Sequence, residues 1–321
     1  MKKIIFMGTP EFAATILTGL IQDVDSQVIA VVTQPDRPVG RKRVLTPSPV
    51  KEIALNHEIP VYQPEVMADS QAYQDLLALD ADIIVTAAYG QLIPEPLLQA
   101  PKYGAVNVHA SLLPKYRGGA PIHYAIWKGD QETGVSIMQM VKELDAGDVY
   151  AQISLPIGDQ DDVGTLFKKL ALIGRELLID TLQRIFDGAI SPQKQDPALV
   201  SYSPTIKKEE EQINWNLSAQ AIDAHIRAFR PFPTTYTLLD QERVKIWQGY
   251  PLKALPAGIE GVDPAQAGTI IGADSDHLYV QAGDQTVFAI EEYQPAGKRR
   301  MSVTEFLKGT PAQQMIGRHF D

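Results

Sequence analysis

The chain has no cysteine among its 321 residues. This absence excludes disulfide bonds, a thiolate nucleophile, and zinc or iron–sulfur sites built on cysteine. The six histidines form no His-x-His or His-x-x-x-His pair beside an acidic residue. The sequence therefore predicts no metal site of any common kind.

Long apolar runs are missing as well. No stretch approaches the roughly 18 apolar residues of a membrane-spanning helix. The apolar run near the start, Ile4–Met7, is shorter than the ~7 residues that form the core of a secretory signal. We expect this run to be a first β-strand, and the protein to be cytoplasmic with no membrane contact.

The glycine-rich fingerprints of nucleotide-binding folds are also absent. Gly8 lies at the first predicted strand-to-helix turn, but neither G-x-G-x-x-G nor G-x-x-x-x-G-K-[ST] occurs. This disfavours a nicotinamide cofactor. The net charge of −10 argues against a nucleic-acid partner, because the phosphate backbone favours positive charge, although a local basic loop on an acidic body can still dock phosphates.

What is present is a pattern that predicts two folded domains. Strands and helices alternate in the first part, which is typical of right-handed βαβ units and a parallel sheet. The expected strands there are Lys3–Phe6, Val28–Thr33, Val61–Tyr62, Asp82–Ala88 and Thr133–Met140, and the expected helices are Glu11–Leu20, Val50–Asn56, Ser70–Leu79, Ile122–Lys128 and Val163–Phe186. In the second part a helix, Ala219–Phe229, precedes strands at Thr235–Leu239, Val244–Gln248, Leu278–Gln281 and Val287–Glu292. These fit a small antiparallel barrel. We expect domains over residues 1–190 and 213–321, joined by a polar linker, 191–212.

The stretch from Gly104 to Gly119, GAVNVHASLLPKYRGG, has an unusual pattern for a buried strand. Val106 and Val108 alternate with Asn107 and His109, and side chains two residues apart share one face of a strand. The amide and the imidazole therefore point together, away from the valines. Polar side chains at the carboxyl end of a strand, followed by a loop, are typical of the ligand site of an open α/β sheet.

These residue types favour acyl transfer. An imidazole is readily poised near neutral pH for proton transfer, and Asn107 offers an amide N–H to a developing oxyanion. Asp145, in the turn Leu144–Asp148 after the next predicted strand, could hold the His109 tautomer, although aspartate and glycine are also ordinary turn residues. With no serine or cysteine nucleophile in the set, direct transfer to an amine is favoured. The residues alone do not identify the acyl donor.

Three further segments have two interpretations each. Residues 34–49, QPDRPVGRKRVLTPSP, form a proline-rich basic loop where a βα loop normally has about 2–6 residues. This loop is either a solvated insertion or a phosphate-binding element. The cluster at 298–300, KRR, is either a solvated turn or a second phosphate contact. The segment AYGQLIP, 88–94, either packs in the core or holds a flat aromatic ligand.

Two motifs together, NVHASLLPKYRGGAPI and GVSIMQMVKELDAGD, resemble the formyltransferases that use 10-formyltetrahydrofolate. The opening FMGTPEFA, the basic loop and AYGQLIP extend this resemblance over essentially the whole chain. It implies an open Rossmann-like, mostly parallel α/β catalytic domain and an OB-like antiparallel β-barrel domain that lies along tRNA. It also implies formyl transfer to the amino group of initiator methionyl-tRNA, for translation initiation. The single small C-terminal domain suggests a monomer.

Residue roles follow from the same resemblance. The catalytic residues would be Asn107, His109 and Asp145. The folate co-substrate would contact Tyr89, Gly90, Leu92, Ile93, Ser111, Leu112, Leu113, Pro114 and Leu144. The tRNA would contact Arg37, Arg41, Lys42, Arg43, Lys207, Lys298 and Arg299. An alternative is a formyltransferase acting on an amino sugar nucleotide, which would share the catalytic residues but does not require the basic loop. A non-catalytic folate- or nucleotide-binding module is a further alternative.

Overall fold

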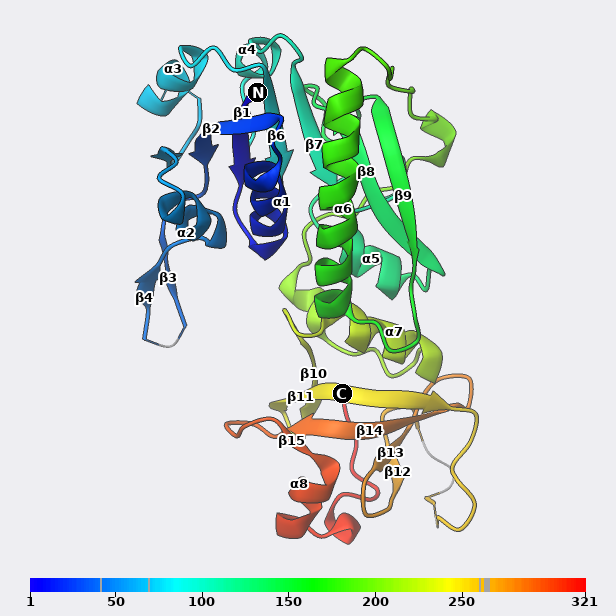
Figure 1. Ribbon diagram of the computed structural model, residues 1–321. Helices are drawn as coiled ribbons and strands as arrows, with labels where there is room; N and C mark the ends of the chain where they lie inside the picture. The colour runs from blue at the N-terminus through cyan, green and yellow to red at the C-terminus, as the bar shows by residue number, and fades with distance from the viewer. Residues whose placement is uncertain (41, 69, 260, 263–265) are drawn as a thin grey trace. The chain divides into compact units, whose positions relative to one another are not determined.

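The structure is a computed structural model that describes residues 1–40, 42–68, 70–259, 261–262 and 266–321. The chain forms two compact units (Figure 1). The first consists of Met1–Pro121, Glu132–Pro156 and Phe167–Pro204, and the second of Ile122–Gln131, Ile157–Leu166 and Thr205–Asp321. Two short segments that precede Phe167 thus belong to the second unit. The predicted linker, 191–212, is divided between the units at Pro204.

The first unit is built on a seven-stranded sheet with the order β5-β2-β1-β6-β7-β8-β9. The strands are β1 (Lys2–Gly8), β2 (Ser26–Val32), β5 (Val61–Tyr62), β6 (Ile83–Ala87), β7 (Ala105–His109), β8 (Glu132–Gln139) and β9 (Val149–Pro156). Pairing is parallel from β5 to β7 and antiparallel from β7 through β8 to β9. This confirms the predicted mostly parallel α/β fold.

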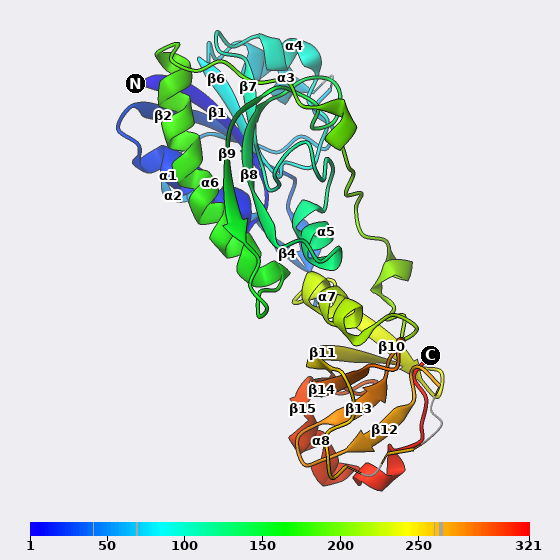
Figure 2. The same ribbon diagram turned by 90° about the vertical axis from the view of Figure 1, so that its right-hand side faces the viewer.

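Helices cover both faces of this sheet (Figure 2). The helices are α1 (Glu11–Gln22), α2 (Pro49–Asn56), α3 (Gln71–Leu77), α4 (Glu95–Gln99) and α6 (Val163–Phe186), which begins in the second unit. On one face α1 and α6 meet through the rings of Phe12 and Phe167, whose centroids are 6.4 Å apart. On the other face Leu76 of α3 and Leu97 of α4 pack in one cluster with Ile84 of β6. The apolar strands are buried because both faces are covered.

The basic loop forms a two-stranded hairpin rather than an irregular insertion. Its strands are β3 (Arg37–Val39) and β4 (Val44–Thr46), and they pair with each other as a separate sheet. At its base Lys51 and Gln63 both bond to Asp36, at 2.7 and 2.8 Å. The hydrogen bonds of the hairpin and of its base hold the described residues of this loop in a defined conformation. We call residues 37–46 the basic hairpin.

The second unit contains an antiparallel sheet with the order β10-β11-β14-β13-β12, and β15 pairs with β14. Its strands are β10 (Thr235–Leu239), β11 (Glu242–Leu252), β12 (Ile270–Ala273), β13 (Leu278–Gln281), β14 (Val287–Gln294) and β15 (Met301–Ser302), and its helices are α5 (Pro121–Trp127, all but its first residue), α7 (Ala219–Phe229) and α8 (Val303–Gly309). The C-terminal residues connect the two edges, because Phe320 bridges Leu239 at the end of β10 and His319 bridges Thr269 just before β12. This arrangement agrees with the predicted small barrel.

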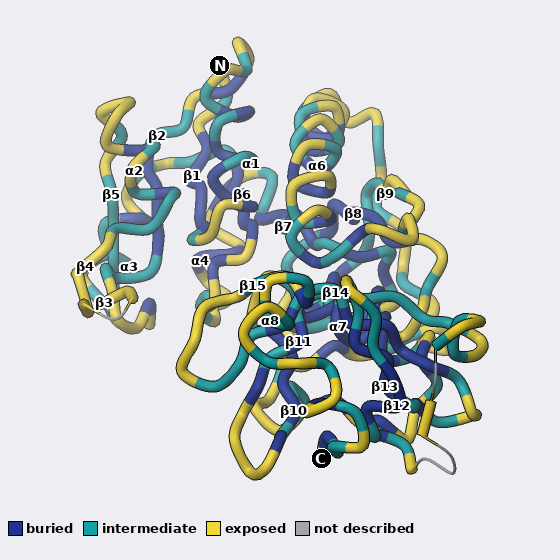
Figure 3. The backbone as a smooth tube through the Cα atoms, turned by 90° about the horizontal axis from the view of Figure 1, so that it is seen from below, coloured by how far each residue is buried: buried dark blue, intermediate teal, exposed yellow. Residues whose placement is uncertain are grey.

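The core of the second unit is mainly aliphatic, with a small group of aromatic rings packed within it. Trp215 stacks on Phe320 and meets Phe288 edge to face, with ring centroids 5.6 and 6.3 Å apart. Figure 3 shows the buried stretches of α7, β12 and β13. Over the described residues, no helix combines the length and the apolar character that crossing a bilayer requires.

His225 of α7 makes this unit sensitive to acid. Its ring stacks on Trp127 with centroids 5.1 Å apart, and its Nε2 donates to the carbonyl of Glu210 at 2.8 Å. Burial of the imidazole lowers the pKa of His225 to about 4. In the unfolded chain the imidazole of His225 is protonated below about pH 6.5, whereas in the folded chain it is protonated only below about pH 4. Stability from the neutral imidazole is therefore complete above pH 6.5 and falls as the pH drops below it.

We expect the free energy of unfolding to fall by about 3 kcal/mol between pH 7 and pH 4 from His225 alone. Urea unfolding at a series of pH values measures this slope. His225→Gln keeps a donor for the Glu210 carbonyl but does not titrate, so it should flatten the slope. The matched control, His57→Gln, changes an exposed histidine and should retain it. An equal slope in His225→Gln and wild type would contradict the prediction.

Candidate active site

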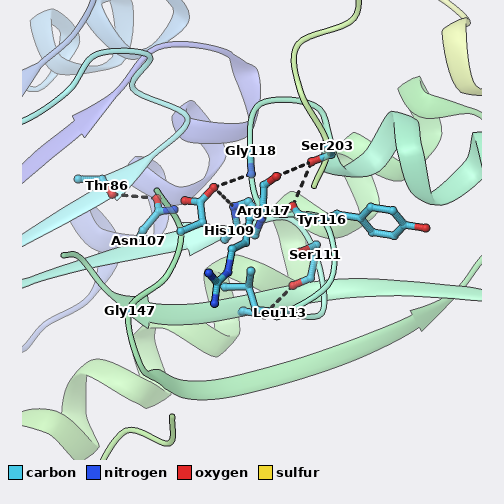
Figure 4. A network of polar contacts seen from close by, with 12 residues as sticks. Thr86, Asn107, His109, Ser111, Leu113, Tyr116, Arg117, Gly118, Gly147 and Ser203 are labelled. Carbon is cyan, nitrogen blue, oxygen red and sulfur yellow. Dashed lines mark hydrogen bonds and ion pairs between the residues drawn. The ribbon is translucent and has the colours of Figure 1, made fainter. Parts of the chain in front are cut away.

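The residues Asn107 and His109 lie on the same face of β7 (Figure 4). The opposite face packs against α6. Val108 lies so close to Gly174 of this helix that a side chain at position 174 would have its Cβ only 3.3 Å from Val108. Only 6% of His109 is exposed. The alternation of the strand thus separates an apolar side from a polar one, as the sequence predicts.

His109 has a hydrogen bond that determines its tautomer. Its Nε2 lies 3.0 Å from the backbone carbonyl of Tyr116, and a carbonyl can only accept, so Nε2 carries the hydrogen. In the neutral ring, Nδ1 is then the nitrogen with the lone pair. Nδ1 lies 3.7 Å from Oδ2 of Asp145. A proton taken up at Nδ1 would therefore be received beside a carboxylate.

Asp145 reaches His109 by a route that strand order does not predict. Because β8 runs antiparallel to β7, the end of β8 at Gln139 pairs with Val106, whereas His109 pairs with Ser136. The loop after β8 must therefore run back along β7 to bring Asp145 to the imidazole. Oδ2 of Asp145 also accepts the N–H of Gly118 at 2.8 Å, which holds the carboxylate in place.

The carboxamide of Asn107 is oriented by Thr86 on the neighbouring strand β6. Thr86 is paired with Asn107 and donates its hydroxyl to Oδ1 of Asn107 at 2.8 Å (Figure 4). This bond leaves the NH₂ end of the amide as the group available to an acceptor outside the protein. Thr86 is not among the predicted site residues, because a threonine in an apolar strand carries no distinguishing signal.

Residues 193–203, which we call the strap, complete the site. Ser201 accepts the N–H of Tyr116 at 3.0 Å, and Ser203 donates its hydroxyl to the Tyr116 carbonyl at 3.1 Å. Gln195 bonds both to Arg117 and to the backbone of the Asp145 loop. The polar, proline-bearing composition of this stretch predicts a linker, whereas its side chains contact the loops of the site.

Three residues of these loops other than glycine have a left-handed backbone conformation. The angle φ is +45° at Ala88 after β6, +60° at Tyr116 and +48° at Asp145. Such angles are uncommon for residues other than glycine and persist only where surrounding contacts hold them. Tyr116 and Asp145 are both held by hydrogen bonds to their own carbonyls.

The residues predicted to bind folate are distributed over three loops. Ser111 is buried and donates to the Lys115 carbonyl at 2.6 Å, and Leu113 donates its N–H to Ser136 at 3.1 Å. Leu92 and Leu144, on the loops after β6 and β8, are 85% and 62% exposed. Exposed apolar side chains of this size are typical of a ligand-binding surface.

Tyr89 differs from the other predicted folate residues. Its ring is 4% exposed and packs in the core cluster with Met67 and Leu97, and burial raises the pKa of its phenol to about 12. Its side chain therefore offers no surface to a ligand, and its carbonyl accepts both the hydroxyl of Thr9 at 3.1 Å and Nε2 of Gln34 at 3.2 Å. Among the neighbouring predicted residues, Leu112, Pro114, Gly90 and Ile93 are partly or fully exposed.

The residues predicted to bind tRNA are exposed on both units. In the basic hairpin, Lys42 and Arg43 are exposed at the tip, and Arg37 pairs with Glu65 at 2.6 Å. Arg41 lies outside the described residues. In the second unit Lys207 and Lys298 are exposed, and Arg299 pairs with Glu305. Within the described part of the chain, no group of three or more His, Asp or Glu is arranged to hold a metal ion.

The arrangement can support acyl transfer to an amine. It offers a nitrogen base backed by a carboxylate, and an amide donor for a developing oxyanion. The sequence model described as Formyl transferase matches residues 1–182, and the one described as Formyl transferase, C-terminal domain, matches residues 205–311.

Curated proteins resemble the chain over its full length. It is 52% identical over 321 residues to the methionyl-tRNA formyltransferase of Pediococcus pentosaceus, with 98% of each chain covered. It is 51% identical over 318 residues to that of Staphylococcus epidermidis, with 99% of each covered. Among solved structures, the N-formyltransferase of Helicobacter canadensis, with folinic acid and dTDP-3-aminofucose, matches with a TM-score of 0.66 and 19% identity, covering 92% of this chain and 100% of the other. That likeness concerns the fold.

Proposed function

The chain belongs to the formyl transferase family, and on this premise we propose that it formylates the free amino group of initiator methionyl-tRNA. The observation that carries the proposal is the identity of about half of all residues, over the full length, to proteins named methionyl-tRNA formyltransferase. Solved structures of the same fold contain folates: HypX of Aquifex aeolicus is in complex with tetrahydrofolic acid, and the N-formyltransferase of Helicobacter canadensis is in complex with folinic acid. We propose 10-formyltetrahydrofolate as the donor for this chain.

The residues present fit such a donor. The apolar side chains of Leu92, Leu144 and Val141 are 85%, 62% and 40% exposed on the loops after β6 and β8, which suits a flat aromatic ring system. When bound, the folate supplies the formyl carbon attached to nitrogen. We propose that the contacts predicted for Ser111–Pro114 and for the backbone of Tyr89 and Gly90 form the rest of this surface.

We propose that Asn107, His109 and Asp145 are the catalytic residues. The amide N–H of Asn107 stabilises the negative charge that develops on the formyl oxygen as the amine attacks the formyl carbon. His109 accepts the proton of the attacking amine at Nδ1, beside the Asp145 carboxylate. The imidazolium then returns this proton to the folate nitrogen as the carbon–nitrogen bond to the donor breaks. The formyl group moves directly between two nitrogens, and no covalent enzyme intermediate forms.

We also propose that the enzyme needs no metal, and we propose its oligomeric state and its location in the cell. Direct transfer between two nitrogens needs neither redox chemistry nor a Lewis acid when an amide and an imidazole are in place. We therefore propose a metal-independent enzyme, acting as a monomer in the cytoplasm, where initiator methionyl-tRNA is used.

The direct test mixes the purified protein with 10-formyltetrahydrofolate and methionyl-tRNA and measures formylmethionine on the RNA. A parallel reaction offers dTDP-3-aminofucose, the kind of acceptor present in the solved N-formyltransferase. Formylation of the RNA alone is the expected result. Formylation of the sugar nucleotide alone would replace the proposal by the alternative, and formylation of neither acceptor would refute both.

We expect the basic hairpin to contribute to tRNA binding. Lys42→Gln with Arg43→Gln should raise the KM for methionyl-tRNA about 10-fold and leave the KM for the folate unchanged, because these residues lie on a hairpin apart from the catalytic residues. It should also reduce the salt dependence of tRNA binding, by a slope of about 0.7–0.9 for each phosphate that the variant no longer neutralises.

The matched control for the hairpin is Lys168→Gln with Lys169→Gln. It removes the same charge from exposed positions of α6, on the face of the sheet opposite to Asn107 and His109. The tRNA KM and the salt slope of this variant should equal those of wild type. Equal changes in both double variants would indicate a general effect of net charge and contradict a specific contact.

A further inference from the structure

Gln195 uses both ends of its carboxamide to connect two loops of the site. Its Oε1 accepts from Nε and Nη2 of Arg117, at 3.0 and 2.8 Å. Its Nε2 donates to the carbonyls of Asp145 and Gly147, at 2.8 and 2.7 Å. Two donors face the oxygen and two acceptors face the nitrogen, so only one orientation of the amide satisfies all four contacts.

The bond to the Asp145 carbonyl bears directly on the carboxylate. Asp145 has φ of +48°, a conformation that a residue with a side chain keeps only when its surroundings hold it. Gln195 fixes the backbone of Asp145, and the Gly118 N–H fixes its side chain at 2.8 Å. Together these bonds set where Oδ2 lies relative to the His109 ring.

The Arg117 side of the contact anchors Gln195 itself. The guanidinium presents two parallel N–H groups to a single oxygen, and Arg117 is held through its backbone because it bridges Tyr202 of the strap. Arg117 also directly precedes Gly118, the residue that donates to Asp145. The amide of Gln195 therefore connects two loops: the one after β7, which contains Arg117, and the one after β8, which contains Asp145.

We propose that Gln195 is a positioning residue for proton transfer: it holds the Asp145 backbone so that the carboxylate faces Nδ1 of His109. This inference rests on the proposed function. It makes the strap part of the active site, although Gln195 does not touch the reacting atoms. A carboxylate displaced from His109 stabilises the imidazolium less, so the rate of the chemical step falls while substrate binding does not change.

The substitution Gln195→Glu removes the contacts to the Asp145 and Gly147 carbonyls but keeps the contact to Arg117. Glutamate has the same shape and still accepts from Arg117, so the strap stays attached. Its second oxygen cannot donate and faces the carbonyls of Asp145 and Gly147, which repels the loop. We expect kcat for formyl transfer to fall about 10-fold, with both KM values within about 2-fold of wild type. The matched control, Gln193→Glu, makes the same change at an exposed side chain of the strap and should leave kcat unchanged.

A double-mutant cycle with Asp145→Asn shows whether Gln195 acts through Asp145. With the carboxylate removed, Gln195→Glu should lower the single-turnover rate less than about 2-fold further. A structural role independent of Asp145 would multiply the two losses. If Gln195→Glu fails to fold, as judged by circular dichroism, Gln195→Met enters the same cycle: it removes the donor without the repulsion, and also the acceptor of Arg117.

The outcomes are distinguishable. An active wild type with an equally active Gln195→Glu would overturn the positioning role and leave the proposed function intact. Multiplicative losses in the cycle would overturn it as well. A wild type that formylates no methionyl-tRNA would refute the proposed function, and the positioning role with it.

Discussion

Replacing His109 by alanine is expected to lower kcat for formyl transfer by at least about 100-fold, and by up to about 10,000-fold. The imidazole combines the two properties that the step needs. Its Nε2 is held by the Tyr116 carbonyl at 3.0 Å, and its Nδ1 faces the Asp145 carboxylate at 3.7 Å. Without the imidazole the proton of the amine must pass to water or directly to the Asp145 carboxylate, which the ring otherwise separates from it, and both are weaker bases than imidazole. Stopped-flow or quenched single-turnover rates with saturating folate and methionyl-tRNA measure the chemical step directly.

The control for His109→Ala is His57→Ala, which removes an exposed histidine at the end of α2 and should leave kcat unchanged. Binding of both substrates to the His109→Ala protein should stay within a few-fold of wild type, because the ring contributes to the transition state rather than to ground-state binding. A His109→Ala enzyme with wild-type kcat would eliminate the proposed mechanism, because another group would then have to move the amine proton.

Replacing Asn107 by alanine is expected to lower kcat about 100- to 1000-fold, the usual cost of removing one oxyanion donor. The Thr86 hydroxyl holds Oδ1 at 2.8 Å and so turns the amide N–H₂ outward. A donor that is already oriented stabilises charge without reorganisation at the moment of reaction. Steady-state kcat and KM for both substrates, with circular dichroism to verify the fold, measure the effect.

The control for Asn107→Ala is Asn56→Ala, at the exposed end of α2. Asn107→Asp provides a sharper comparison, because its carboxylate accepts from Thr86 but places negative charge where the oxyanion develops. Its loss of kcat should be at least as large as that of alanine. If Asn107→Asp retained wild-type kcat, the amide would not be the oxyanion donor, and the role would have to be assigned elsewhere.

Much of the fold was predictable because its signals are local. The continuous apolar runs of β2 and β6 and the helical spacing of α6 predict buried parallel strands and a long covering helix. The alternation of Val106 and Val108 with Asn107 and His109 predicts two distinct faces of β7. In the second unit the strand-like runs and their turns predict the antiparallel sheet.

Other elements carry weaker local signals. β9 is an edge strand whose residues are mostly half-buried or exposed, so no apolar alternation marks it. β12 has only four residues, one of them Gly272. The hairpin strands β3 and β4 are fully exposed, and a proline-rich basic composition predicts a loop. Tyr89 is the opposite kind of difference: its place at a strand end next to a glycine predicts a ligand contact, but its side chain lies in the core.

By itself the sequence determined the class of the fold, the two-domain organisation and the strand that presents Asn107 and His109, because each depends on residues close together in the chain. Only the tertiary structure decided how Asp145, Thr86 and Gln195 reach that strand. The Asp145 carboxylate bonds to Gly118, 27 residues away, and Gln195 bonds to Asp145, 50 residues away. Such contacts follow from the antiparallel turn at β8 and from the return of the chain after α6, and periodicity along the sequence contains no information about either.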